Sequence, residues 1–341
     1  MSLKIGIVGL PNVGKSTLFQ ALTKKAVDRS NYPFATIDPN IGVVAVPDGR
    51  LEKLAILSKS AKIIPAIVEF VDIAGLVKGA AAGEGLGNQF LTHIKNVDAI
   101  VEVVRVFKDA SVTHVEGEPN PKRDIEIIEA ELILKDLEVL EKALQKLGRE
   151  SKSGDKKIAE KFEKLKTLIS KLNGGSLEFS PEEKTLAGEY ELLVSKPRLY
   201  CFNAKFAHEI PAGYEKNSVI LDLKQEFEVS ELSKEEKREL GVASDLGKLI
   251  VKAYEILNLI SFFTTGEDET RAWTIPKGSK APRAGRAIHG DFENKFIRAE
   301  VIGAEDLLAS ESIAKAREKG LMRIEGKDYV VKDGDVIEFR I

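Results

Sequence analysis

Short runs of apolar residues in the first two thirds of the chain predict buried β-strands. Three clear runs are LKIGIVG near the start, PAIVEFVD ending at Asp72, and RLYCF just before Asn203. Each run is short, apolar and bounded by glycine, proline or polar residues, which is typical of a strand inside a sheet. The segment KSTLFQALTKK follows the first run and has the spacing of a helix. This alternation of strand and helix predicts an α/β fold with a mainly parallel sheet.

Apolar residues spaced three and four positions apart predict two long helices between residues 125 and 172. The first set is Ala130, Ile133, Leu137, Leu140, Leu144 and Leu147, and the second is Ile158, Phe162, Leu165, Ile169 and Leu172. Such spacing is the seam of a coiled coil. The polar turn GRESKSGD separates the two sets, so we expect an antiparallel helical hairpin. Its charged faces fit a solvated surface and a partner-sensing surface equally well.

Alternating segments near the C-terminus predict a small sheet. ETRAWTIP, FIRAEVIG, LMRIEG and VIEFRI are short and separated by glycine-containing turns, and their order fits a β-grasp domain. We therefore expect three domains. These are an α/β domain over residues 1–124 and 197–257, an inserted hairpin over 125–196, and a β-grasp domain over 258–341.

The composition limits the class of protein and the cellular compartment. The chain has 43% hydrophobic and 31% charged residues, as an ordinary folded protein does. Its single cysteine, Cys201, excludes an internal disulfide and suits a reducing compartment. No apolar run approaches the roughly 20 residues of a membrane helix, and the first strand leaves no room for a leader. We expect a cytoplasmic protein without membrane contact. The net charge of -3 means that any nucleic-acid contact needs a local basic patch.

The glycine turn GLPNVGKST carries the strongest chemical signal. Gly9, four further residues, and then Gly14, Lys15 and Ser16 match the phosphate-loop pattern, with a strand before it and a helix after it. The glycines let backbone N–H groups point inward and form an anion site at the helix N-terminus. Lys15 would reach the β- and γ-phosphates, and the Ser16 hydroxyl would bind Mg²⁺. An ordinary glycine-rich turn is the alternative, and the flanking elements argue against it.

A second signal predicts a switch that senses the terminal phosphate. Asp72 ends a strand and Gly75 follows it, which would place a carboxylate beside the metal and a backbone N–H beside the γ-phosphate. Four more glycines come in VKGAAAGEGLGNQF, so this loop can change conformation with the nucleotide. Thr36, in a proline-flanked loop, could supply a second hydroxyl to the metal.

These motifs together resemble one family. GLPNVGKST, NYPFATIDPNIGVVAVPD, DIAGLVKGAAAGEGLGNQFL, VTHVEG, RAWTIP and EGKDYVVKDGDV are similar to segments of the YchF family, also called Obg-like ATPases, among the translation-factor-related P-loop GTPases. The resemblance spans nearly the whole chain. It implies a nucleotide-hydrolysing domain, an inserted helical hairpin, a C-terminal β-grasp domain of the TGS type, and association with ribosomes.

The resemblance also assigns roles. It makes Ser16 and Thr36 the protein ligands of Mg²⁺. The residues expected to wrap the phosphates are Asn12, Val13, Gly14, Lys15, Ser16 and Thr17. Leu76 stands where many GTPases carry the glutamine that orients water, so another group must do this. The resemblance points to His114 in that role, whereas a lone loop histidine is otherwise more often a surface residue. Asn12 resembles the asparagine that binds K⁺ in related GTPases.

The base-reading segment departs from the family pattern. Its residues are Asn203, Ala204, Lys205 and Phe206, so the acid that accepts hydrogen bonds from guanine is missing. Since one charge-assisted hydrogen bond is worth about 1.5–3 kcal/mol, we expect ATP to be favoured over GTP. Asn203 would brace the phosphate loop, and the Ala204 backbone would touch the base. Asp222 and Leu223 lie where a later base-contacting element is expected.

A local basic patch lies in PKGSKAPRAGRAIHG. Its members are Lys277, Lys280, Arg283, Arg286 and His289. Few aromatic residues are interleaved, so contact with the backbone of structured RNA is favoured over base stacking. A solvated positive loop is the alternative.

The sequence therefore predicts a Mg²⁺-dependent P-loop nucleotide hydrolase, with catalytic roles for Lys15, Gly75 and His114. We expect ATP or GTP and the ribosome as partners, and no DNA. Two alternatives remain: a scaffold or RNA-binding module that holds nucleotide with little hydrolysis, and a small-molecule phosphotransferase, for which no acceptor pocket or arginine lid is evident.

Overall fold

The chain folds into two compact units built from interleaved segments. The computed structural model describes residues 3–24, 27, 32, 38, 40–73, 93–108, 114, 117–150, 155–204 and 211–341. One unit, here the sheet-grasp unit, comprises Met1–Leu3, Ala21–Phe70 and Val229–Ile341. The other, the loop unit, comprises Lys4–Gln20 and Val71–Glu228. Neither unit is therefore one continuous stretch of sequence.

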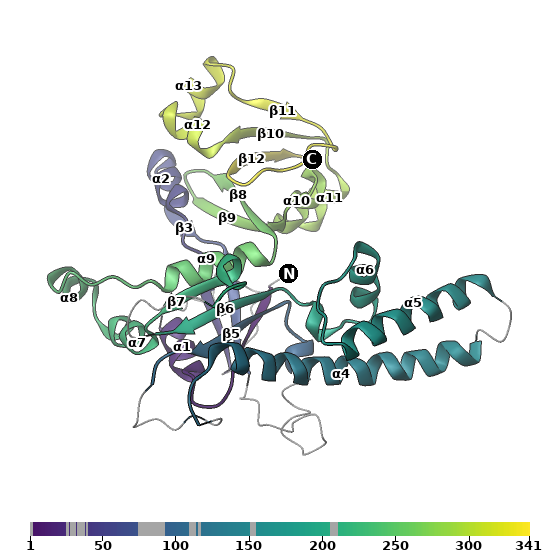
Figure 1. Ribbon diagram of the computed structural model, residues 1–341. Coiled ribbons are helices and arrows are strands. Elements are labelled where there is room, and N and C mark those ends of the chain that lie inside the picture. The colour runs from purple at the N-terminus through teal and green to yellow at the C-terminus, as the bar shows by residue number, and fades with distance from the viewer. Residues whose placement is uncertain are drawn as a thin grey trace. The chain divides into compact units, whose positions relative to one another are not determined.

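A parallel sheet forms the core of the loop unit (Figure 1). Its strands, in spatial order, are β1 (Lys4–Val8), β5 (Ala99–Arg105), β6 (Arg198–Asn203) and β7 (Ser218–Leu221). Every residue of β5 is buried, as expected for a strand covered on both faces. The predicted parallel α/β fold is confirmed.

The sheet sets up the glycine turn. Strand β4 (Ile67–Asp72) ends beside β1, because the N–H of Ile73 donates to the carbonyl oxygen of Ile7 at 3.3 Å. Helix α1 (Lys15–Thr23) begins directly after the turn. Leu18 and Leu22 on this helix are fully buried. Asp72 is thereby brought to the same edge of the sheet as the turn.

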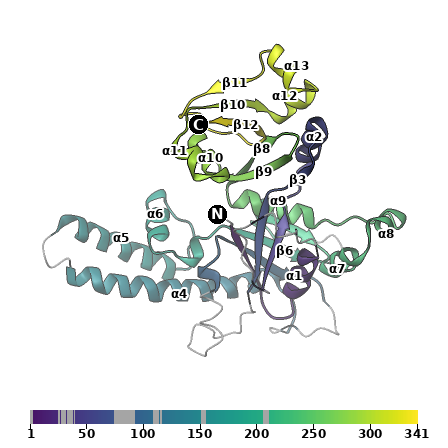
Figure 2. The ribbon, with the colours of Figure 1, turned by 180° about the vertical axis from the view of Figure 1, so that it is seen from behind.

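The inserted hairpin is present, and its predicted seam is wrong at Ala130. Helices α4 (Pro121–Glu150) and α5 (Lys156–Asn173) pack side by side (Figures 1 and 2). Ala130, placed in the seam by its spacing, is exposed, whereas Ile125 and Leu132 are fully buried. At the start of α4, Ile125 packs with Val104 of β5, so the buried face there follows the sheet.

The α4 and α5 pair is closed at its base by short elements. Helix α6 (Pro181–Glu189) packs on α5, and the turn η4 (Leu193–Ser195) packs on α4. The Asp136 carboxylate accepts hydrogen bonds from the N–H groups of Leu193 and Val194, each at 2.9 Å. Its burial raises the Asp136 pKa to about 6. The Asp136 carboxylate therefore links α4 to η4, which directly precedes β6 of the sheet.

A second, mixed sheet forms most of the sheet-grasp unit. Its strands, in spatial order, are β11 (Arg323–Glu325), β10 (Arg298–Gly303), β12 (Asp335–Arg340), β8 (Leu259–Thr265), β9 (Glu269–Pro276) and β3 (Lys62–Ile64). Strand β8 is antiparallel to β9 and parallel to β12, and α10 (Ala281–Ile288) packs on β9 (Figure 2). The expected β-grasp arrangement is thus observed.

Two elements of this sheet-grasp unit come from far upstream, which the sequence patterns did not indicate. Strand β3 extends the sheet by parallel pairing with β9, with Lys62 opposite Glu269. Helix α2 (Gly49–Ser58) packs on β8 and β9, and its Arg50 pairs with Asp333 at 2.8 Å. Local spacing cannot reveal partners so distant in sequence.

The remaining elements are short. They are β2 (Ile41–Ala45), η5 (Glu215–Asn217), α7 (Leu223–Glu231), α8 (Lys234–Glu239), α9 (Leu246–Ile256), α11 (Gly290–Asn294), α12 (Ala304–Ala309) and α13 (Ile313–Glu318). Among the described helices, none combines the length and apolar content needed to cross a bilayer.

Candidate functional site

The glycine turn adopts a conformation that its residue types explain. Gly9, Asn12 and Gly14 have φ angles of 153°, 61° and 111°, a region that disfavours most side chains. A Cβ atom on Gly9 would lie 2.6 Å from the carbonyl oxygen of Val103, and one on Gly14 would lie 2.7 Å from Asn203 Nδ2. Both glycines are therefore required by backbone geometry and by space.

Asn203 fixes the turn to the neighbouring strand. Its Nδ2 donates to the carbonyl oxygen of Val13 at 2.9 Å, and its Oδ1 accepts from the N–H of Leu223 at 3.2 Å. Asn203 is only 8% exposed, so water competes little for these bonds. The expectation that Asn203 braces the glycine loop is confirmed.

The loop borders a cavity of about 590 Å³, within the roughly 300–1,000 Å³ of ligand pockets. Its lining residues are Asn12, Val13, Gly14, Lys15, Ser16, Thr17, Gln20, Phe107, Asn203, Asp222, Leu223, Lys224 and Phe227. They come from the last residue of β6 and from the loops and helices that follow β1, β5 and β7, at the carboxyl ends of parallel strands, where open α/β sheets bind ligands. The whole predicted segment from Asn12 to Thr17 lines this cavity.

Lys15 is a half-buried cation that lines the cavity. Its Nζ donates to the carbonyl oxygen of Leu10 at 2.8 Å. Burial lowers the Lys15 pKa from 10.5 to about 8, and nearby Asp72 partly offsets this. The ammonium therefore remains largely charged at neutral pH. A polyphosphate would replace a weak neutral acceptor with a strong anionic one.

Asp72 and Ser16 are the described oxygen donors that could serve a metal. Burial raises the Asp72 pKa, and the charge of Lys15 counteracts this rise. Ser16 is exposed and lines the cavity. Within the described part of the chain, no cluster of three or more His, Cys, Asp or Glu residues could hold a metal alone. Hard oxygen donors of this kind fit Mg²⁺, which takes its other ligands from phosphate and water. Thr36, Gly75 and Leu76 lie outside the described residues.

His114 and Ala204 are not part of the cavity lining. His114 is 4% exposed, and its Nε2 lies 3.0 Å from Asp124 Oδ2. Ala204 is buried, and its N–H donates to the carbonyl oxygen of Leu221 at 3.0 Å. The structure thus unites the loop residues, Asn203 and Asp72, and holds His114 against the start of α4.

Several lining residues escaped sequence reasoning. Gln20, Phe107, Lys224 and Phe227 belong to no local motif. Phe107 and Lys224 shortly follow the ends of β5 and β7, which is the signal that could have identified them. Phe107 also packs against the buried Arg105, whose guanidinium lies 4.8 Å from the ring centroid. The cavity therefore offers an aromatic side chain beside a phosphate-type loop.

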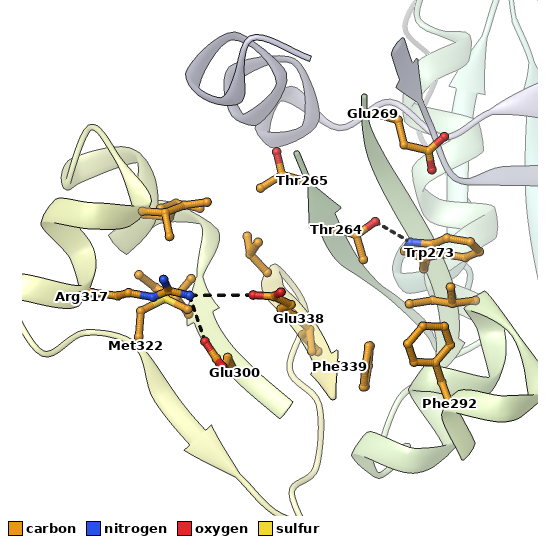
Figure 3. Close-up of a pocket in the computed structure, with 16 residues that line it drawn as sticks. Thr264, Thr265, Glu269, Trp273, Phe292, Glu300, Arg317, Met322, Glu338 and Phe339 are labelled. Carbon is orange, nitrogen blue, oxygen red and sulfur yellow. Dashed lines mark hydrogen bonds and ion pairs between the residues drawn. The ribbon is translucent and has the colours of Figure 1, made fainter. Parts of the chain in front are cut away.

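The sheet-grasp unit contains a separate cavity of about 370 Å³ (Figure 3). Strands β8 and β12 share a single bridge between Phe263 and Val336, and the cavity is lined by residues beyond it, including Thr264 and Phe339. Trp273 donates its Nε1–H to Thr264 at 2.9 Å. This cavity holds none of the predicted catalytic, phosphate-binding or metal-binding residues.

The basic segment is exposed but partly neutralised. Lys280 pairs with Asp328 at 2.6 Å, and Arg286 pairs with Glu293 at 3.0 Å. Arg283 and Lys277 are also exposed. Because exposed ion pairs are weak, an anionic partner could still compete for these side chains.

Comparisons with known proteins agree with this geometry. A family model described as "50S ribosome-binding GTPase" matches residues 4–146. A second, YchF-GTPase_C, described as a protein of unknown function, matches residues 259–341. "Ribosome-binding ATPase YchF" of Bacillus subtilis is 49% identical over 100% of this chain and 99% of its own length.

Other relatives are similar throughout. "Ribosome-binding ATPase YchF" of Escherichia coli O157:H7 is 44% identical, covering 99% of both chains. The solved structure of the Schizosaccharomyces pombe YchF GTPase is 37% identical and superimposes with a TM-score of 0.86, over 99% of this chain and 98% of that one. The similarity therefore extends over both units.

Proposed function

Because the chain belongs to the YchF family, we propose that it is a Mg²⁺-dependent nucleoside triphosphatase that favours ATP over GTP and acts on ribosomes. The observation that carries this proposal is the braced glycine loop, with Lys15 at the edge of a cavity large enough for a nucleotide. A ribosome partner would place the protein in the cytoplasm.

The proposed reaction is hydrolysis of the terminal phosphate. A water oxygen bonds to the γ-phosphorus, and the bond from that phosphorus to the β–γ bridging oxygen breaks, giving the diphosphate and inorganic phosphate. Lys15 and the backbone N–H groups of residues 12–17 stabilise charge on the phosphate oxygens. Ser16, Thr36 and Asp72 would hold Mg²⁺, which neutralises phosphate charge. Gly75 would contact the γ-phosphate, and His114 would orient the water.

The cavity supports a preference for ATP. Both polar atoms of the Asn203 amide are engaged in bracing the loop, so they are not available to read a base. Asp222 Oδ1 accepts the N–H groups of Lys224 and Gln225, each at 3.1 Å, and so caps the next helix. Phe107 offers a ring that stacks on any base. Asp222 is the carboxylate of the described lining, and the capping role of its Oδ1 leaves it less able to select guanine.

Ribosome association is proposed from the relatives, whose names include "Ribosome-binding ATPase", and from the exposed basic segment that contains Arg283. We extend the proposal to K⁺ beside Asn12, whose exposed side chain stands at the cavity. Comparing hydrolysis rates in potassium and sodium buffers tests this part separately.

The decisive test is a titration of ATP, GTP and their diphosphates in Mg²⁺ buffer, with and without ribosomes. We expect ATP to bind more tightly than GTP, and Lys15→Ala to lose at least tenfold in affinity. A wild-type chain that binds no triphosphate, or a Lys15→Ala variant that binds normally, would overturn the proposal. Single-turnover hydrolysis separates it from a nucleotide-holding scaffold, which would retain intact ATP.

A further inference from the structure

The contact between His114 and Asp124 suggests how the proposed hydrolysis is restrained, and this inference rests on the function proposed above. The side chains of His114 and Asp124 are 1% and 3% exposed, with Nε2 and Oδ2 only 3.0 Å apart. Gly117 closes the loop behind His114 by donating its N–H to the His114 carbonyl oxygen at 3.1 Å. The imidazole is thus docked in a protein interior and lies outside the cavity lining.

Asp124 is itself held firmly in place. Its Oδ1 accepts from Arg123 Nη2 at 2.9 Å and Nε at 3.2 Å, and its Oδ2 accepts from the N–H of Asn120 at 3.3 Å. Arg123 is anchored in turn, since its Nη2 donates to the Glu118 carbonyl oxygen at 2.6 Å. The carboxylate is therefore fixed against the His114 imidazole, at ion-pair distance but without hydrogen-bond geometry to Nε2.

The docking residue belongs to the long helix of the hairpin. Asp124 is in the first turn of α4, which has 30 residues and so extends about 45 Å. The next residue, Ile125, is fully buried against Val104 of β5 and Phe202 of β6. A shift of the start of α4 would therefore alter the Asp124 position and the sheet contacts together.

We propose that Asp124 is a restraining residue, which holds His114 away from the phosphate cavity until movement of α4 separates the two side chains. A histidine engaged with a buried carboxylate cannot orient water at a γ-phosphate elsewhere. The docked and released arrangements then form a two-state equilibrium, and whatever displaces α4 increases the fraction that can hydrolyse nucleotide. The hairpin thereby acts as an input to catalysis.

Asp124→Asn tests the restraint, because it keeps the shape and removes the charge. We expect single-turnover ATP hydrolysis to become about three- to thirtyfold faster, since the 3.0 Å contact of His114 with the carboxylate is weakened. The double variant with His114→Ala should return to the rate of His114→Ala alone. Glu126→Gln is the matched control, because this carboxylate lies on the same helix, is 57% exposed and should leave the rate unchanged. An unchanged or slower rate in Asp124→Asn overturns the proposal.

Two further measurements distinguish a failure of the restraint from a misfolded variant and from a failure of the proposed function. Arg123→Gln, which loosens the support of Asp124, should accelerate hydrolysis to a smaller degree. Nuclear magnetic resonance of ¹³C-labelled histidine reads the docking directly, with His114 assigned among the four histidines by His114→Ala. Asp124→Asn and a non-hydrolysable ATP analogue with Mg²⁺ should each move the His114 signal. If His114→Ala hydrolyses normally, the catalytic assignment fails, and a signal unmoved by both treatments overturns the restraint.

Discussion

Single residues decide whether the glycine loop can hold an anion. The glycines were predictable because the φ angles of the turn are a local property, whereas the atoms that crowd them, on Val103 and Asn203, are distant in sequence. The bracing by Asn203 was predictable from its position after a strand. Phe107 was not, because its place in the cavity depends on how β5 and β6 pair. The docking of His114 on Asp124 likewise depends on where α4 meets the sheet.

The Lys15 ammonium predicts a pH-dependent affinity. Burial lowers its pKa to about 8, and only the protonated form attracts phosphate strongly. We expect the Kd for Mg²⁺–ATP to be flat below pH 7.5 and to rise about tenfold per pH unit above the pKa. Isothermal titration calorimetry between pH 6.5 and about 9.5 measures this. Lys15→Arg, which stays charged, should flatten the profile, and a flat wild-type profile would contradict the prediction.

The same lowered pKa affects the ligand-free protein with a definite sign. Between about pH 8 and 10.5 the unfolded chain binds more protons at Lys15 than the folded chain does. The Lys15 contribution to the free energy of unfolding therefore rises with pH across this window. As pH rises through this window, the free energy of unfolding of the ligand-free protein should increase while its affinity for nucleotide decreases.

Asn203→Ala should loosen the loop. The change leaves the Val13 carbonyl oxygen and the Leu223 N–H without their partners. Since each buried unsatisfied group costs about 1–3 kcal/mol, we expect the free energy of unfolding to fall by about 2–4 kcal/mol and ATP affinity to fall with it. Urea unfolding gives the first value. The exposed Asn217→Ala is the control, and equal effects of both variants would refute the bracing role.

Among the elements, β5 carries an unusual buried carboxyl group. Glu102 is fully buried, and within the described residues neither carboxylate oxygen has a hydrogen-bond partner. The nearest cation is Arg198, whose Nη1 lies 3.6 Å from Oε2. Burial therefore raises the Glu102 pKa from 4.5 to about 8. The apolar residues of β5 buried this strand in the sheet, and its one acid, Glu102, is therefore unfavourable to ionise.

Glu102 predicts a pH-dependent stability. Between about pH 4.5 and 8 the folded chain binds more protons at Glu102 than the unfolded chain does. The contribution of Glu102 to the free energy of unfolding therefore falls as pH rises through this window. Glu102→Gln should match the wild type near pH 5 and be more stable by roughly 2–4 kcal/mol above pH 8. Thermal unfolding across pH measures the difference. The exposed Glu141→Gln should show no pH-dependent difference from the wild type. If the stability of Glu102→Gln and that of the wild type change in parallel with pH, the prediction is wrong.

At the scale of the whole molecule, the chain order conceals which parts fold together. The expected boundary near residue 258 follows local composition, whereas α2 and β3 pack with the sheet that begins at β8. The fold class was predictable because the main strands of the parallel sheet and the two long helices have clear local apolar patterns. The assignment of an upstream strand to a downstream sheet was not, because pairing partners are chosen by tertiary contacts.

Strand β3 predicts a long-range effect on β9. Lys62 donates its N–H to the Asp268 carbonyl oxygen at 3.2 Å, so by strand alternation the Ile64 N–H also faces β9 and the Ile63 N–H faces away. Lys62→Pro should speed hydrogen exchange of the β9 amides by roughly tenfold, because proline removes this donor, and Lys62 and Ile63 are both exposed. Ile63→Pro is the matched control. Equal exchange in both variants would show that β3 does not protect β9.

The pairing of β3 with β9 also sets an order of events during synthesis. A translating ribosome adds about 5–20 residues per second, so β3 emerges roughly 10–40 s before its partner, roughly 200 residues downstream, exists. During that interval the apolar side of α2 and the edge of β3 have no native cover. Until β9 has been synthesised, α2 and β3 must stay apart from other chains or be bound by a chaperone.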